Sequence, residues 1–173
     1  MKIFYINIEE FKKKYDKNFL ALYADIELKT EKRFYEYTIG RYLIKNIAKQ
    51  YYEINDTEII INENGKPSFA NSNLHFSLSH SKNIVIACFD EYPCGIDIEY
   101  VKEKDLTKLS KYFKKDFETL EDFYKYWTQR EAQYKLDKPA KSVYSANFKN
   151  NYYLTIVSNS NIDENKLSIK QYK

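Results

Sequence analysis

Apolar residues recur along the chain with two different periods, and these periods divide it into predicted strands and helices. Alternation with a period of two, or a short apolar run, predicts strands at residues 1–8, 57–61, 74–81, 83–89, 95–99, 143–148, 152–157 and 167–169. Spacings of three and four predict two long helices, 31–52 with Thr30 as its N-cap and 116–136, and shorter amphipathic segments at 10–15 and 106–113. The apolar stretch at 20–26 fits either type.

Each long helix carries one charged residue inside its apolar stripe. The first stripe holds Arg41 among Phe34, Tyr37, Ile44, Ala48 and Tyr51, and the second holds Glu131 among Phe117, Leu120, Tyr124, Trp127 and Tyr134. An arginine there would either pair with a nearby acid or line an anion site. A buried glutamate needs a partner, and Lys135 one turn later is the local candidate. The similar layout of the two helices favours two related halves about a shared cleft, with basic residues on one side and acids on the other.

The segment around Asp97 is the centre of the predicted chemistry. Ile96 and Ile98 would face a core, and Asp97 and Glu99 would project side by side from the opposite face of a strand. Adjacent carboxylates repel each other, and a hard cation such as Mg²⁺, which takes oxygen ligands, relieves that repulsion. Gly95 permits close approach of a backbone or a ligand. An amphipathic strand with an acidic face toward solvent explains the same pattern equally well.

Two turns flank the strands that precede this segment. Residues 64–65, Asn-Gly, predict a turn that presents Lys66 from an ordered loop just before Pro67. Residues 90–93 predict a turn that joins the strands on either side of it as a hairpin. Such a hairpin would fix the position of the carboxylate pair.

The strand predicted at 74–81 alternates apolar and hydroxyl side chains. Phe76 and Leu78 lie on one face, and Ser77 and Ser79 lie on the other. His80 stands near the strand end between two serines. This histidine is either an exposed turn residue or a contact for a phosphate group.

Composition and charge limit the class of protein. The chain has 173 residues, of which 43% are hydrophobic, so it is long enough to bury a core as one domain or two closely packed ones. A net charge of +3, with 28 basic and 25 acidic residues, gives no reason to expect a nucleic-acid binder. Cys88 and Cys94 do not have metal-ligand spacing and are expected as small core residues. Without a signal peptide or a long apolar run, the sequence predicts a cytoplasmic protein that is not bound to a membrane.

Four segments, in this order, resemble the motifs of the 4'-phosphopantetheinyl transferases. They are Gly-Lys-Pro at 65–67, Phe-Ser-Leu-Ser-His-Ser at 76–81, Gly-Ile-Asp-Ile-Glu at 95–99, and Trp-Thr-Gln-Arg-Glu at 127–131 with Lys135. The sequence is most similar to the larger, monomeric type, which acts on carrier proteins of peptide synthetases and of fatty-acid and polyketide synthases. The resemblance covers about residues 30 to 136.

This resemblance implies an α+β fold with two pseudo-repeated halves. Each half would be a long helix packed on a small, mostly antiparallel sheet, with the active site in the cleft between them. Residues 1–92 would form the coenzyme A side and residues 93–173 the metal and catalytic side of one compact unit. A monomer that is itself a pseudo-dimer is the implied state.

The resemblance also implies a reaction. The 4'-phosphopantetheine moiety of coenzyme A would pass to a serine of an apo acyl or peptidyl carrier protein, with release of 3',5'-ADP and dependence on Mg²⁺. Asp97, Glu99 and Glu131 are implied as ligands of Mg²⁺, and Glu131 as the group that takes the serine proton. Lys135 would neutralise phosphate charge. The residues implied for coenzyme A are Arg41, Lys66, Pro67, Ser79 and His80, with Arg41 and His80 at the 3'-phosphate.

The sequence departs from the family pattern in three places. Arg130 stands where the family usually has lysine. The N-terminal basic cluster is abbreviated, which leaves the roles of Lys32 and Arg33 open, and the C-terminal half is short.

Two other classes of function remain open on the sequence alone. The Asp-x-Glu and Glu-x-x-x-Lys spacings also suit a metal-dependent nuclease or phosphodiesterase, although that class favours a more basic surface. A non-catalytic module that binds coenzyme A or a carrier protein is the other alternative.

Overall fold

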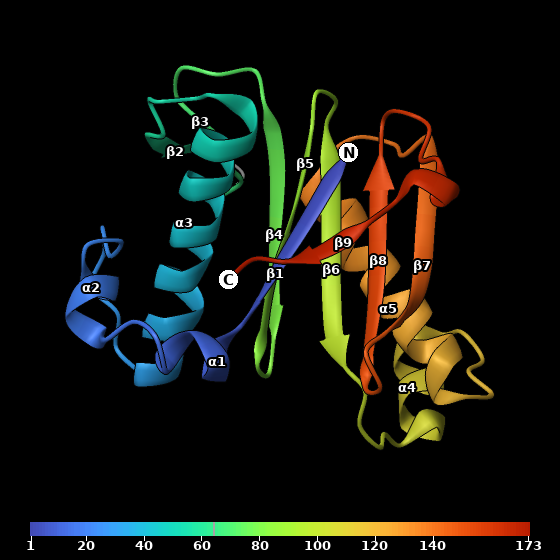
Figure 1. Cartoon of the computed structure of the whole chain (residues 1–173). Coiled ribbons are helices and arrows are strands. Elements are labelled where there is room, and N and C mark those ends of the chain that lie inside the picture. Colours follow the sequence, from blue (N-terminus) through green and yellow to red (C-terminus); the bar gives the residue numbers. More distant parts are fainter. Residues whose placement is uncertain (64) are drawn as a thin grey trace.

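A computed structural model describes residues 1–63 and 65–173 (Figure 1). The strands are β1 (Lys2–Asn7), β2 (Ile59–Ile61), β3 (Pro67–Phe69), β4 (His75–Ser81), β5 (Ile84–Asp90), β6 (Cys94–Tyr100), β7 (Ser142–Phe148), β8 (Tyr152–Ser158) and β9 (Ile169–Gln171). The helices are α1 (Ile8–Lys12), α2 (Lys17–Ala21), α3 (Glu31–Tyr52), α4 (Leu106–Phe113) and α5 (Leu120–Leu136), with a 3-10 turn at Glu164–Lys166. The predicted α+β class is confirmed. Asn64 of the predicted turn at 64–65 lies outside the described residues.

The strands form two main sheets and one small pair. The first sheet has the order β4-β5-β1-β9 and is antiparallel except for β1 and β9, which run parallel. The second sheet has the order β6-β8-β7 and is antiparallel throughout. Strands β2 and β3 form an antiparallel pair of their own. In Figure 1, α3 stands beside the first sheet and α5 lies behind the second.

Three apolar layers hold these elements together. One core fills the space between α3 and the first sheet, a second lies between the two sheets, and smaller clusters join the second sheet to α4 and α5. Strand β5 serves two of these cores because its alternate side chains point to opposite faces. Val85, Ala87 and Phe89 enter the first core, and Ile84, Ile86 and Cys88 enter the second. Cys88 and Cys94 are buried and free, as predicted.

The two sheets also meet edge to edge along β4 and β6. Here serine hydroxyls of β4 accept hydrogen bonds from backbone N–H groups of β6. The three donor–acceptor pairs are Ile96 to Ser77 (3.1 Å), Ile98 to Ser79 (3.3 Å) and Tyr100 to Ser81 (2.9 Å). The sequence separation is 19 residues in each pair. Because the register advances in the same direction on both strands, β4 and β6 run parallel at this junction, which we call the serine seam.

Helix α5 packs closely against β6 at a glycine. A Cβ added at Gly95 would lie 2.1 Å from the backbone oxygen of Ala132 and 3.0 Å from the backbone nitrogen of Leu136. The sequence left open whether a backbone or a ligand approaches Gly95, and in the structure it is the backbone of α5. Small side chains at Thr128 and Ala132 face the sheet for the same reason.

This close approach explains one of two errors in the predicted helical stripes. Tyr134 is 75% exposed rather than buried, and the buried face of α5 instead runs through Phe123, Tyr124, Thr128, Ala132 and Leu136. Only small residues fit where the helix crosses Gly95, so the bulky ring points away from the sheet. In α3, Tyr51 is likewise exposed, and the core face carries Ile39, Leu43 and Ile47.

Several element boundaries also differ from the prediction. Helix α5 begins at Leu120 rather than at 116, because Thr119 and Asp122 form a capping box that fixes the first turn. Strand β9 begins two residues later than predicted, after the 3-10 turn. Helices α1 and α2 begin before the segments at 10–15 and 20–26, and β2 covers only the end of 57–61. The first long helix matches its prediction, with the Thr30 hydroxyl accepting from Arg33 N at 3.2 Å.

The predicted hairpin at 90–93 is wrong. The turn instead carries the chain from the first sheet to the second, since β5 pairs with β1 and β4 whereas β6 pairs with β8. A connection of this length permits either arrangement, and long-range pairing decides between them.

We expect Gly95→Ala to destabilise the fold. The added methyl group would meet backbone atoms of α5, which cannot move without shifting the helix, so the free energy of unfolding should fall by about 3 kcal/mol. Urea unfolding measures this loss. Gly40→Ala is the matched control, because its added Cβ meets only the mobile end of Leu78 and alanine favours a helix, so its change should stay within about 1 kcal/mol. Equal losses for the two variants would contradict the packing argument.

Candidate active site

A cleft of about 500 Å³ opens between α3, the edge strand β4, the β2–β3 pair and the end of α5. Its lining includes positively charged or ionisable nitrogen side chains from several of these elements: Arg33 and Arg41 from α3, Lys66, His80 from β4, and Lys135 from α5. Pro67 also lines it. The structure thus brings Arg41, Lys66, Pro67 and His80, four of the five residues predicted for coenzyme A, to one cavity. Ser79, the fifth, lies in the serine seam.

The Lys66 side chain extends across the cleft toward α5, the helix that packs on the second sheet. Its Nζ lies 3.4 Å from the backbone oxygen of Leu136, at the C-terminal end of α5. Free carbonyl groups at a helix C-terminus attract cations, so this contact is favourable. The ammonium group is therefore held beside the end of α5, where this helix borders the cleft.

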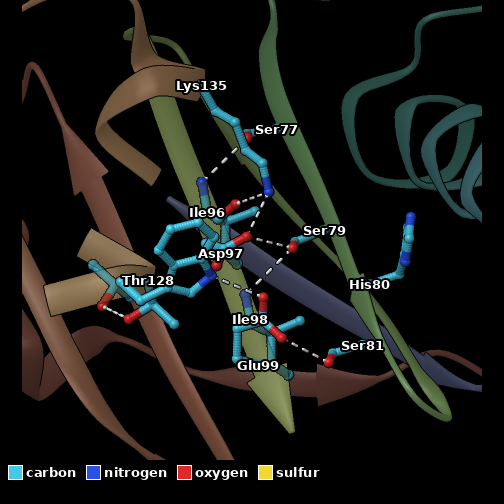
Figure 2. A network of polar contacts seen from close by, with 12 residues as sticks. Ser77, Ser79, His80, Ser81, Ile96, Asp97, Ile98, Glu99, Thr128 and Lys135 are labelled. Atoms are coloured by element: carbon cyan, nitrogen blue, oxygen red, sulfur yellow. Dashed lines mark hydrogen bonds and ion pairs between the residues drawn. The ribbon is translucent and has the colours of Figure 1, made fainter. Parts of the chain in front are cut away.

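Strand β6 presents Asp97 and Glu99 next to the serine seam (Figure 2). Asp97 is 5% exposed, which rules out the alternative of an acidic strand face open to solvent. Its Oδ1 accepts hydrogen bonds from Ser79 Oγ (2.8 Å) and Lys135 Nζ (2.7 Å). Lys135 also donates to the backbone oxygen of Ile96 at 3.0 Å. The lysine therefore links the carboxylate to the cleft.

The second oxygen of Asp97 has no such contact. Asp97 Oδ2 is buried and has no hydrogen-bond partner among the described residues. A buried carboxylate oxygen without a partner carries a large desolvation penalty. The unpartnered oxygen therefore suits a ligand that supplies positive charge, and Mg²⁺ in proteins is commonly held by one or two carboxylates together with substrate phosphates and water.

Glu99 is held by both of its oxygens. Trp127 Nε1 donates to Oε1 at 3.1 Å, and Ser81 Oγ donates to Oε2 at 3.1 Å. Burial raises the pKa of the Glu99 carboxyl, and the negative charge of Asp97 raises it further. A bound cation would offset both effects.

The predicted ion pair between Glu131 and Lys135 does not form among the residues that the structure describes. Glu131 is half-buried on α5, and Lys135 bonds to Asp97 instead of to Glu131. Lys135 is thus not the partner that the helix spacing indicated, because a buried carboxylate across the interface offers it a stronger contact. In the part of the chain that the structure describes, no three His, Cys, Asp or Glu side chains gather closely enough to hold a metal. The role of Glu131 as a third ligand remains a prediction.

His80 faces α3 rather than the serine seam. Its Nδ1 lies 3.4 Å from Glu36 Oε1, and its Nε2 lies 3.4 Å from Arg33 Nη1. Burial lowers the pKa of His80; Glu36 opposes this shift, and Arg33, Lys135 and Lys32 add to it. A neutral ring can donate from Nδ1 to the carboxylate and accept at Nε2 from the guanidinium. The exposed-turn alternative for His80 is therefore wrong.

Arg41 pairs with an acid and still has an unpartnered nitrogen. Its Nη2 lies 3.4 Å from Asp25 Oδ2 and donates to Tyr37 Oη at 2.8 Å. Tyr37 in turn donates to Asp25. Arg41 Nη1 is buried without a hydrogen-bond partner among the described residues. The guanidinium on the wall of the cleft therefore retains one donor group for an anion.

Sequence reasoning missed several residues of the site. Ser81 and Trp127 hold Glu99, and Arg33 and Glu36 flank His80. The repeat of serine at every second position of β4 was the available signal for Ser81. Partners such as Glu36 come from a distant helix, and no local pattern indicates them.

Comparison with known proteins complements this geometry. No family model matches the chain. The 4'-phosphopantetheinyl transferase ffp of Bacillus subtilis is 31% identical over 107 residues, covering 54% of this chain and 48% of that protein. The 4'-phosphopantetheinyl transferase psf-1 of Bacillus pumilus is 33% identical over 111 residues, covering 57% and 48%. The 4'-phosphopantetheinyl transferase HetI of Nostoc sp. is 32% identical over 141 residues, covering 66% and 59%. These similarities support the 4'-phosphopantetheinyl transferase family for this chain.

The chain spans about half the length of the first two curated relatives named above. None of the helices that the structure describes combines the length and the apolar character needed to cross a membrane.

The depressed pKa of His80 predicts a pH dependence of stability. As pH falls below the ordinary histidine pKa, the unfolded chain takes up a proton that the folded state refuses, so the free energy of unfolding decreases through that window. His80→Gln removes this contribution. We expect the variant to lose less stability than the wild type between about pH 7 and pH 5, measured by urea unfolding. His75 is present in both proteins, so the difference isolates His80, and equal losses would contradict the assignment.

Proposed function

We propose that the protein transfers the 4'-phosphopantetheine moiety of coenzyme A to a serine of an apo acyl or peptidyl carrier protein. The products are the holo carrier protein and 3',5'-ADP, and the reaction depends on Mg²⁺. The observation that carries this proposal is the contact between Lys135 and Asp97, because it joins the phosphate-binding cleft to the carboxylate pair. The curated relatives named for this activity support it.

The cleft has the charges that coenzyme A requires. That ligand carries a diphosphate and a 3'-phosphate, and Arg41, Lys66 and Lys135 supply charged donors to such groups. His80 lines the same cleft, and its Nδ1 would donate to a phosphate that replaced Glu36 as its acceptor. We assign the 3'-phosphate to Arg41 and His80, since both lie on the α3 side. Lys66 and Lys135, on the α5 side, would contact the diphosphate.

The acidic residues would hold the metal and prepare the nucleophile. Asp97 and Glu99, with Glu131 as the predicted third ligand, would bind Mg²⁺, which when bound neutralises charge on the diphosphate. Glu131 would take the proton of the carrier serine, whose oxygen then forms a bond to the phosphorus next to pantetheine. The bond from that phosphorus to the bridging oxygen breaks, and 3',5'-ADP leaves with the electron pair. Lys135 stabilises the charge that develops on the leaving group.

The proposal also assigns a separate role to each half of the chain. Residues 1–92 would bind coenzyme A and residues 93–173 would supply the metal ligands and Lys135. A monomer suffices for this reaction, because one chain contributes both sides of the cleft.

Mass spectrometry of carrier proteins tests the proposed function. The protein is incubated with coenzyme A, Mg²⁺ and a panel of apo carrier proteins, and an added phosphopantetheine group on a carrier serine is the expected result. The nuclease alternative predicts cleavage of nucleic acid instead, and the non-catalytic module predicts binding without an adduct. Unmodified carriers throughout the panel would refute the proposal.

Asp97→Asn should abolish most of the transfer while the fold persists. The amide oxygen can still accept from Ser79 and Lys135, but the site loses the charge that holds the cation. We expect turnover to fall by about two orders of magnitude or more. The melting temperature without metal should change little, because the variant loses both the repulsion between residue 97 and Glu99 and the charge attraction between residue 97 and Lys135, and these two effects oppose each other. Near-normal turnover at low Mg²⁺ would exclude Asp97 as a ligand.

Arg41→Gln should weaken binding of coenzyme A much more than binding of 3'-dephospho-coenzyme A. One charge-assisted contact to phosphate is worth roughly 1.5–3 kcal/mol, which is roughly a tenfold to hundredfold change in affinity. Asp25→Asn is the matched control, since it frees Arg41 from its acidic partner and should leave the preference for the 3'-phosphate intact or stronger. Titration calorimetry with both ligands measures these affinities. Equal losses with both would show that Arg41 is structural.

A further inference from the structure

The carboxylate of Glu99 lies between two donors that come from different parts of the fold. Ser81 belongs to β4 in the first sheet, and Trp127 belongs to α5 behind the second sheet. One donor contacts each oxygen, at 3.1 Å in both cases. The terminal torsion of a glutamate side chain is broad when free, so two donors on opposite oxygens fix the plane of the carboxylate.

The serine seam determines where the Ser81 proton points. Ser81 Oγ accepts the backbone N–H of Tyr100 at 2.9 Å, which leaves its own proton for Glu99. Ser79 repeats this arrangement one step earlier, accepting from Ile98 N and donating to Asp97. Each hydroxyl thus joins the two strands and orients a carboxylate at the same time.

The third serine of the seam, Ser77, has no carboxylate beside it. Ser77 accepts from Ile96 N at 3.1 Å, but the residue that corresponds to Asp97 and Glu99 is Gly95, where α5 leaves no room for a side chain. Ser77 therefore shares the structural role of Ser81 without the contact to an acid. It provides an internal comparison between joining strands and positioning a carboxylate.

We propose that Ser81 and Trp127 are positioning residues that hold the Glu99 carboxylate in the orientation in which it binds a divalent cation. The carboxylate is pre-organised by contacts from β4 and α5, so cation affinity depends on how these two elements are placed relative to β6. Partners of this kind typically contribute tenfold to hundredfold in metal affinity. The inference rests on the proposed function for its kinetic test, and its spectroscopic test is independent of activity.

Trp127 is the only tryptophan of the chain, so its indole N–H gives one distinct signal in a proton–nitrogen NMR spectrum. This group donates directly to Glu99 and reports on the carboxylate. We expect the signal of the full chain to shift when Mg²⁺ is added, and Glu99→Gln to reduce that response. If the indole signal of the wild type does not shift when Mg²⁺ is added, the inference is overturned.

Three variants separate positioning from structure. Ser81→Ala should move or broaden the indole signal and weaken Mg²⁺ affinity on the order of tenfold, measured by calorimetry. Ser81→Thr retains the hydroxyl and should restore both. Ser77→Ala should lower the melting temperature about as much as Ser81→Ala but keep the indole signal in place. Equal effects of Ser77→Ala and Ser81→Ala on the indole signal and on Mg²⁺ affinity would show that Ser81 is only structural.

Trp127→Phe and the kinetic test complete the experiment. Phenylalanine keeps a ring against Phe123 but removes the N–H donor, so Mg²⁺ affinity should fall on the order of tenfold. In the transfer assay, Ser81→Ala and Trp127→Phe should lower kcat by a similar factor and leave KM for coenzyme A nearly unchanged. Normal Mg²⁺ affinity and kcat in both variants would refute the positioning role. The expected indole and affinity results without any transfer by the wild type would refute the proposed function alone.

Discussion

The hydrogen bonds between serine hydroxyls of β4 and backbone N–H groups of β6 are the contacts on which the candidate site depends. A regular strand pair would use backbone carbonyls as acceptors, and the hydroxyls of such strands would have no fixed direction. In the serine seam each hydroxyl accepts from the backbone, so its proton is available to Asp97 or Glu99. The same bonds that join two sheets therefore aim two carboxylates.

Burial of this junction accounts for the electrostatics. Ile96 and Ile98 anchor β6 in the core between the sheets, which draws the intervening Asp97 away from water. Lys135 offsets part of that charge at one oxygen of Asp97, and the other oxygen has no hydrogen-bond partner among the residues that the structure describes. The raised pKa of Glu99 has the same origin, since desolvation and a neighbouring carboxylate act in the same direction. The site is thus short of positive charge on the carboxylate side, whereas the lining of the cleft beside it has more basic than acidic side chains.

Much of the secondary structure was predictable because it follows from local pattern. The period of two in β4, β5 and β6 and the Thr30 cap of α3 gave the strands and one long helix within a residue or two. The predicted apolar stripes of the helices were less accurate than the helix bounds. The buried face of α5 is set by its close approach to Gly95 and not by the positions of its aromatic residues. The sequence predicts a hairpin at the turn after β5, whereas the structure places β6 in the other sheet, because local sequence does not reveal which sheet the next strand joins.

The sequence by itself determined the candidate residues of the site, because paired acids, the Gly-Lys-Pro turn and the Ser-His-Ser strand end can be recognised in the sequence without knowledge of the fold. It also indicated that Arg41 and Glu131 are exceptions within apolar stripes. Only the tertiary structure decided their partners. Arg41 meets Asp25, and Lys135 reaches across to Asp97 rather than along its own helix to Glu131. The reason is that a buried carboxylate on a neighbouring strand binds an ammonium group more strongly than a half-exposed one on the same helix, and only folding brings that strand within reach.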